Sequence, residues 1–170
     1  MKTVKTLSII IFTIFCATAV NAQKHNTKNN IDTLVNAYMG IKNALIANDG
    51  TQAHYKANEL FNILKSQPDK GLSKDQQKIL IDHLEKLLYD SRHINETTTV
   101  DHQREHFASL SKNMYEVLKG IKMNTVPIYE QYCPMKKAYW LSESKQIKNP
   151  YFGSEMLTCG KVTETLASVK

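Results

Sequence analysis

The sequence has few of the residues that mark several large classes of protein. It contains 6 glycines and 4 prolines in 170 residues, which excludes a collagen-like or low-complexity chain. No segment recurs at a spacing of roughly 20–50 residues, so a solenoid or propeller is not expected. With 42% hydrophobic and 22% charged residues, the composition is that of an ordinary globular protein, and the length predicts one domain.

Several functional signatures are also missing. The sequence has no G-x-S-x-G motif, no P-loop and no dinucleotide-binding fingerprint. Its positive charges are scattered, whereas nucleic-acid binding requires clustered Lys and Arg. We therefore expect no nucleic-acid partner and, on the motifs present, no enzymatic activity.

One apolar run is long enough to act as a targeting signal. Lys2 and Lys5 precede the run Leu7–Val20, and the small residues Val20 and Ala22 stand at −3 and −1 before Gln23. The run has about 14 residues, whereas a spanning helix needs roughly 20. This pattern predicts a secretory signal peptide at 1–22 and a periplasmic or secreted protein.

Two other fates of this segment are less consistent with its sequence. A retained membrane anchor requires a longer apolar run, and lipidation at Cys16 is disfavoured because the bulky Phe15 precedes it. Cleavage leaves 20 basic and 16 acidic side chains, a net charge of +4, with no stable membrane anchor. Residues 23–30 are polar and are expected to form a flexible lead-in.

From residue 31 onward, apolar residues recur at steps of three and four, which predicts amphipathic helices. The stripes run over 31–46, 53–64, 80–94 and 107–121. An isolated amphipathic helix is marginal in water, so each stripe must pack against another. The expected fold is all-α: an antiparallel four-helix bundle over about 31–122, within a single helical domain at 31–170.

Capping residues set the predicted helix boundaries. Residues 48–50 (Asn-Asp-Gly) end the first helix, and Thr51 is the expected N-cap of the second. Ser73 with Gln76 predicts a capping box for the third helix. A weaker second box is formed by residues 98 and 101, and the fourth helix should end near residue 120.

The last fifty residues have a different pattern. Residues 126–132 and 139–141 are prone to extended structure, and the Asn149-Pro150 pair marks a turn. Residues 158–169 are expected to form a short closing helix. We interpret 126–170 as an irregular Cys- and Met-containing cap on the bundle, with room for one small hairpin.

Four sulfur-containing residues in this cap form a candidate metal site. Cys133 and Met135 lie in one short segment, and Met156 and Cys159 in another. Thiolate and thioether ligands favour Cu(I) over hard cations such as Mg²⁺. These four residues therefore predict soft-metal binding.

A structural disulfide is the alternative. Two cysteines in a secreted protein pair by default, and closing the loop from Cys133 to Cys159 would contribute about 3.5 kcal/mol in the loop-entropy model. The protein would then be a helical interaction module without metal. The surface near Trp140 and Tyr151 would dock its partner.

The histidines offer a second set of ligands. His102 and His106 are four residues apart on one helix face, so both could reach one ion. Residues 102–106 also match the H-x-x-E-H pattern of zinc peptidases, with Glu105 as its acid. A catalytic zinc needs a third protein ligand, and none is evident in sequence. His83 lies among leucines and is expected to be a hydrogen-bonded residue at the edge of the core.

The motifs of the cap resemble a known family. Tyr132–Ser142 (YCPMKKAYWLS), Ile147–Gly153 (IKNPYFG) and Met156–Gly160 (MLTCG) are similar to the signature of the domain of unknown function 3347 family. The helical part resembles it more weakly, at 38–49 and 103–111. The resemblance covers most of residues 31–168.

The resemblance implies an exported protein of a Gram-negative bacterium. Similar domains are attached to periplasmic adaptor subunits of heavy-metal efflux pumps, so such a system, or another periplasmic protein, is an expected partner. Carried over by position, the candidate ligands are Cys133, Met135, Met156 and Cys159. The chain shows none of the other adaptor segments, and we expect it to be a free-standing module that binds Cu(I) or a similar soft ion.

Overall fold

The computed structural model describes residues 30–66 and 69–169. The predicted signal peptide (1–22) and the lead-in up to residue 29 lie outside the described residues, and residue 30 is already helical. Four helices follow, at residues 30–46, Gly50–Lys65 (α2), Lys74–Asn95 (α3) and Val100–Ile121 (α4). Across the described ranges, no helix combines the length and apolar character needed to cross a membrane. The four predicted helices are confirmed.

The N-termini of α2 and α3 are set by local capping hydrogen bonds. The Asp49 carboxylate accepts from the Gln52 N–H at 2.8 Å, so Asp49 is the N-cap of α2 and the prediction of Thr51 is wrong by two residues. At α3, the capping box is confirmed. Ser73 Oγ accepts from the Gln76 N–H, and the Gln76 side chain accepts from the Ser73 N–H.

The ends of α4 differ from the prediction in detail. Thr99 is the N-cap and makes no capping hydrogen bond through its side chain, so the predicted box between residues 98 and 101 is wrong. At the other end, Lys122 adopts a left-handed conformation with φ +53° and stops the helix one residue past Gly120.

The C-terminal region contains an antiparallel sheet, so the all-α prediction is wrong. Its strands are Ile128–Cys133 (β1), Ala138–Ser142 (β2) and Lys161–Leu166 (β3), in the order β2-β1-β3. The predicted hairpin is confirmed as β1 and β2, whereas the predicted closing helix at 158–169 is largely the strand β3. A short 3-10 helix, Gly153–Met156, lies between β2 and β3. The cysteines thus belong to an ordered sheet layer, and no irregular Cys-containing cap is established.

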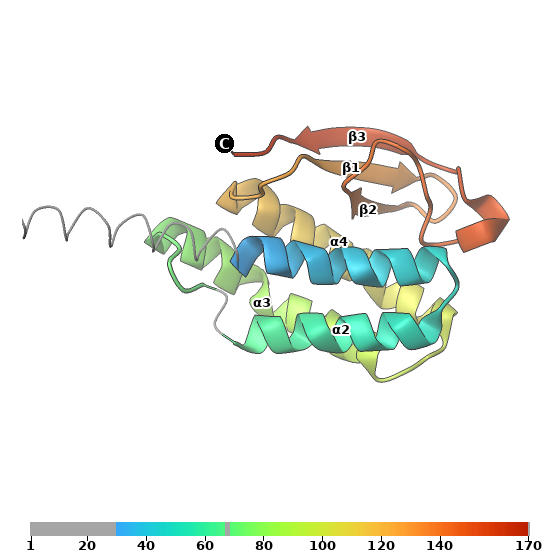
Figure 1. Ribbon diagram of the computed structural model, residues 1–170, viewed down its shortest axis with the longest axis horizontal. Helices are drawn as coiled ribbons and strands as arrows, with labels where there is room; N and C mark the ends of the chain where they lie inside the picture. The colour runs from blue at the N-terminus through green and yellow to red at the C-terminus, as the bar shows by residue number, and fades with distance from the viewer. Residues whose placement is uncertain (1–29, 67–68, 170) are drawn as a thin grey trace, which may run out of the picture.

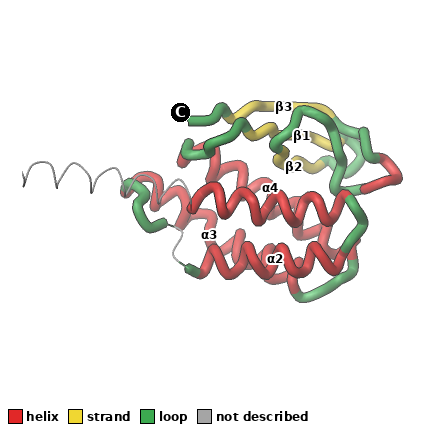
Figure 2. Tube along the Cα trace, in the orientation of Figure 1, coloured by secondary structure: helices red, strands yellow, loops and turns green. Residues whose placement is uncertain are grey.

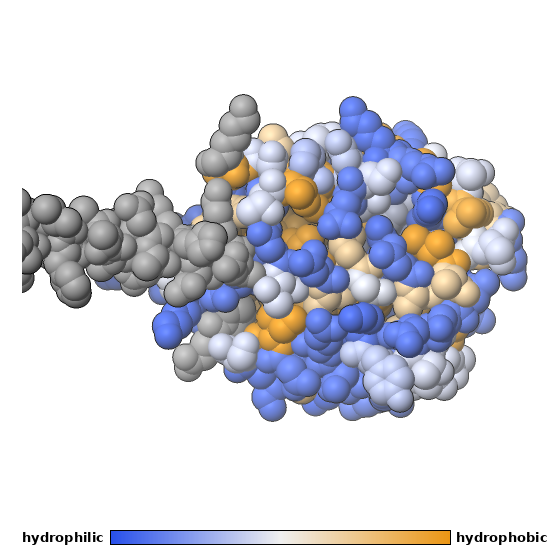
Figure 3. Space-filling model, viewed as in Figure 1, coloured by the Kyte–Doolittle hydropathy of each residue, from blue (hydrophilic) through white to orange (hydrophobic). Residues whose placement is uncertain are grey.

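The sheet covers one side of the helices. Figure 1 shows it lying along the first helix and α4, with α2 and α3 on the side away from the sheet. The trace in Figure 2 shows the loop after β2 and the 3-10 helix at the same end of the molecule. The main core joins both layers and includes Tyr38, Phe107 and Trp140, each 0% exposed. The face seen in Figure 3 is largely hydrophilic, with only scattered apolar residues.

Polar contacts also join the layers. The Arg104 Nε donates to the Pro150 carbonyl at 2.8 Å, and its Nη2 donates to Asn48 Oδ1 at 2.6 Å. A Cβ on Gly153 would lie 2.6 Å from Asn48 Oδ1 and 3.0 Å from Arg104 Nη2, and Gly153 has φ +54°. Only glycine accommodates both constraints without strain. This network holds the 149–153 turn against the ends of the first helix and α4.

Candidate functional site: a thiol pair and a histidine cluster

The sheet brings the two cysteines together. Tyr132 pairs with Lys161 at the end of the β1–β3 ladder, so the residues just beyond this pair on the two strands face each other. Cys133 ends β1, and Cys159 lies two residues before β3 begins. Cys133 acts electrostatically on the Cys159 thiol, and both residues are free thiols.

Cys133 is buried and surrounded by N–H donors. It is 0% exposed, and its Sγ accepts from Asn149 Nδ2 at 3.1 Å and from the Lys136 N–H at 3.4 Å. The same Asn149 amide group donates to the Cys159 carbonyl at 2.7 Å. Asn149 therefore holds both cysteine segments together.

Cys159 is partly buried, and its thiol is electrostatically linked to Cys133. Desolvation raises the pKa of Cys159 above its ordinary value, and the charge and hydrogen bond of Cys133 raise that pKa further. The backbone N–H of Met135 acts in the opposite direction. The Cys159 thiol therefore holds its proton more tightly than a free cysteine does.

The two methionines lie beside this pair through their backbones. Met135 follows Cys133 by two residues, and the Met156 carbonyl accepts from the Cys159 N–H at 3.0 Å. Their side chains are 63% and 39% exposed. All four sulfur residues thus gather at one end of the sheet, with the thioethers at the surface.

The aromatic residues nearby are part of the core. Trp140 is 0% exposed and Tyr151 4%, with ring centroids 6.1 Å apart. Tyr151 also packs on Phe107 of α4. These rings pack the sheet onto the helices, and the docking surface expected near them stays a prediction.

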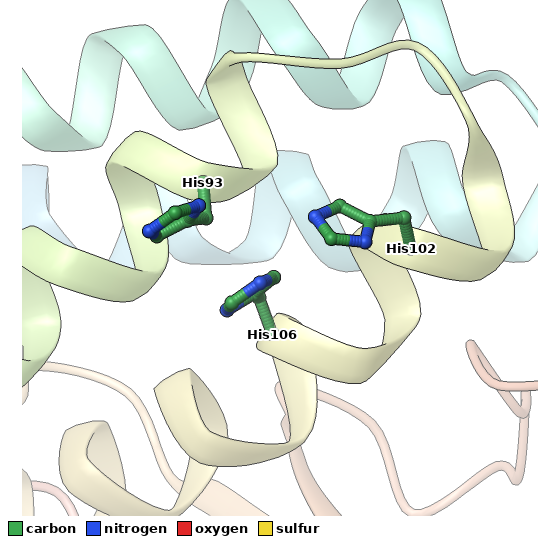
Figure 4. Close-up of side chains that lie close together, drawn as sticks. All are labelled: His93, His102 and His106. Atoms are coloured by element: carbon green, nitrogen blue, oxygen red, sulfur yellow. The ribbon is translucent and has the colours of Figure 1, made fainter.

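A second cluster lies between α3 and α4. His102 and His106 are joined by His93, which sequence reasoning missed, and one ligand atom from each lies within 4.8 Å of the others. The His93 and His106 rings are stacked, with centroids 4.6 Å apart and an interplanar angle of 9°. In Figure 4, the His102 ring points toward the space between the other two.

The structure separates the two sets of ligands that the sequence had grouped. In the described part of the chain, the three histidines are the one group of three or more His, Cys, Asp or Glu residues with ligand atoms this close. Neither Cys133 nor Cys159 belongs to that group. His102 and His106 therefore do not contribute to the sulfur site.

Sequence reasoning missed His93 because its link to His102 depends on helix packing. The two residues are nine positions apart, on either side of the 96–99 link between antiparallel helices. Residues at similar distances from such a link face each other. The similar distances of His93 and His102 from the link could therefore have suggested their contact from the sequence. The H-x-x-E-H pattern thus does have a third histidine nearby, contrary to expectation. His83 is a hydrogen-bonded histidine as predicted, with Nδ1 3.0 Å from Asn113 Oδ1.

The comparisons with known proteins give one match. The model of the family described as Protein of unknown function (DUF3347) matches residues 34–125. No curated protein and no solved structure matches the chain. The matched segment spans the helices and the histidine cluster but ends before β1, although the resemblance had been clearer in the cysteine motifs. Because the match covers more than half of the sequence, the chain belongs to the family Protein of unknown function (DUF3347).

Proposed function

We propose that the protein is a periplasmic or secreted module that binds Cu(I), or a similarly soft cation, through its sulfur residues. The observation that carries the proposal is the placement of Cys133 beside Cys159 at the end of the β1–β3 pair, where the Asn149 amide donates to the Cys133 sulfur and to the Cys159 carbonyl. Two adjacent thiols become two thiolate ligands when a cation replaces their protons, and thiolates select soft ions. The module would buffer the ion or pass it to a heavy-metal efflux system or another periplasmic protein.

The surroundings of Cys133 supply N–H donors to its sulfur. N–H groups that donate to a metal-bound thiolate disperse its charge and fix its direction. Asn149 and Lys136 supply two such donors. Replacing Asn149 by Leu should therefore weaken Cu(I) binding by roughly 10–100-fold, the range typical of residues that support metal ligands.

Cys159 adds a dependence on pH. Since its pKa lies above the ordinary value, its thiol is protonated at neutral pH, and a bound cation must displace that proton. Affinity for Cu(I) should therefore increase as the pH rises from about 7 to about 9. The Met135 and Met156 thioethers carry no proton in this range and add neutral ligands from the surface.

The test is a Cu(I) competition titration of the reduced protein against a chromogenic chelator. Stoichiometric binding tighter than roughly 10⁻¹² M corresponds to about 16 kcal/mol and requires several preorganised ligands. The double variant Cys133→Ser, Cys159→Ser should lose this binding, and Met135→Leu with Met156→Leu should weaken it. Met123→Leu, a partly buried methionine outside the site, is the control. Unchanged affinity in the double serine variant would refute the proposal.

The same juxtaposition favours a second candidate function. Two thiols in contact oxidise readily, and a Cys133–Cys159 disulfide would make the protein a stapled interaction module without metal. Non-reducing intact-mass analysis of protein isolated from the cell envelope distinguishes the two candidates. A mass about 2 units below the reduced value, whether or not copper is added to the medium, would support the disulfide.

A further inference from the structure

The histidine cluster between α3 and α4 forms a separate site of different chemistry. We propose that His93, His102 and His106 bind one borderline divalent cation such as Zn²⁺, independently of the thiol pair. Imidazole nitrogens suit Zn²⁺, whereas thiolates and thioethers favour Cu(I). The inference therefore extends beyond the proposed function and does not depend on it.

Each histidine has a carboxylate near the same ring nitrogen, and at His106 this contact is a hydrogen bond. His106 Nδ1 lies 3.3 Å from Asp90 Oδ1, and His93 Nδ1 lies 3.3 Å from Glu96 Oε2. His102 Nδ1 lies 3.8 Å from Glu105 Oε2. A carboxylate beside Nδ1 favours the tautomer with hydrogen on Nδ1, which leaves the Nε2 lone pair free for a metal. The hydrogen bond to Asp90 prepares His106 as a ligand, and Glu96 and Glu105 lie near the same nitrogen of the other two rings.

Asp90 supplies an independent indication of a missing positive charge. It is 3% exposed, and its second oxygen, Oδ2, has no hydrogen-bond partner among the described residues. A buried carboxylate is costly unless it is paired and hydrogen-bonded. A cation on Nε2 of His106 would polarise the Nδ1–H and increase the attraction between this ring and Asp90. Metal-bound histidines are commonly held by carboxylates in this manner.

The geometry requires only side-chain motion to bind an ion. Nitrogens around one tetrahedral Zn²⁺ lie roughly 3.3 Å apart when each bond is about 2.0 Å. The ligand atoms lie within 4.8 Å of one another, and the His102 side chain is 48% exposed. His93 and His106 must also turn from their stacked arrangement. Three histidines leave a fourth position for water, as in open zinc sites.

The test is a Zn²⁺ titration of the purified protein against a chromogenic competitor, repeated with Co²⁺ for its visible spectrum. We expect one ion per chain. His102→Ala should weaken binding at least 10-fold, and His93→Ala at least 100-fold. His54→Ala, on α2 away from the cluster, is the matched control and should leave the affinity unchanged. If the His102 and His93 variants bind as tightly as the His54 variant, the site does not exist.

Two further variants separate this site from its alternatives. Cys133→Ser with Cys159→Ser should leave Zn²⁺ affinity unchanged, and the Co²⁺ spectrum should lack thiolate charge-transfer bands. Loss of binding in this variant would assign the ion to the thiol pair and overturn the inference. Asp90→Asn should lower Zn²⁺ affinity by 10–100-fold without lowering the thermal midpoint of the metal-free protein. Equal affinity in Asp90→Asn and in the unmodified protein would remove the argument from Asp90.

Discussion

The hydroxyl group of Tyr38 links the helices to the sheet, and its removal should have a pH-dependent cost. Tyr38 is 0% exposed on the first helix. Its oxygen lies 2.7 Å from Ser111 Oγ on α4 and accepts the Leu141 N–H of β2 at 3.0 Å. Tyr38→Phe keeps the ring but leaves two buried polar groups without this partner. At about 1 kcal/mol each, the free energy of unfolding at neutral pH should fall by about 2 kcal/mol.

The destabilisation caused by Tyr38→Phe should decrease as the pH rises above about 10. Burial raises the pKa of Tyr38 far above its ordinary value, and hydrogen bonds from Ser111 and Leu141 oppose this only in part. A group with a raised folded-state pKa stabilises the fold fully below its unfolded-state pKa of about 10 and loses that contribution as the pH rises toward the folded-state pKa. At about pH 11 the unmodified protein should have lost about 1.4 kcal/mol through Tyr38. The phenylalanine variant has no such group, so the difference between the two should narrow from about 2 to about 0.6 kcal/mol.

The assay is urea unfolding at a series of pH values between about 7 and 11, with Tyr55→Phe as the control. Tyr55 is 59% exposed, so its replacement should change the free energy of unfolding by less than about 0.5 kcal/mol at every pH. The parent and Tyr38→Phe curves should converge as the pH rises. Parallel curves would show that Tyr38 ionises normally in the folded protein and would refute the reasoning.

Three further predictions concern the framework of the two sites. Gly50→Ala would place a Cβ 1.9 Å from a backbone carbonyl oxygen in the link between α3 and α4. It should lower the free energy of unfolding in urea by about 2–4 kcal/mol and broaden the NMR signals of that link. A loss below about 0.5 kcal/mol would contradict this packing. Ser73→Ala should cost about 1 kcal/mol by losing the capping box, whereas Thr99→Ala, at a cap without a side-chain bond, should be near neutral; equal costs would contradict the capping argument. Arg104→Met should lower the free energy of unfolding by about 2–4 kcal/mol, because it leaves the buried carbonyl groups of Pro150 and Leu45 without their donor. It should also increase hydrogen exchange at the turn after β2. Unchanged exchange at that turn would contradict this role of Arg104.

Local signals were strong enough to predict most of the helical half. The apolar stripes and the Ser73–Gln76 box depend on residues three or four apart, and a helix brings such residues together without help from the rest of the chain. β1 and β2 were also visible, because their residues are β-prone and a short turn joins them. β3 was misread as helix. It is an outer strand with largely exposed residues, so it lacks the alternation of buried and exposed positions that identifies a strand.

The candidate sites show the same division between sequence and tertiary structure. The available ligands can be read from the residues alone: two cysteines, two nearby methionines, and His102 and His106 on one helix face. How these ligands are grouped depends on the way the helices and strands pack. The β1–β3 pairing brings Cys133 to Cys159, and the antiparallel packing of α3 on α4 brings His93 to the other histidines. Neither contact follows from the spacing of residues within one helix or strand, because each joins two elements that meet only when the chain packs.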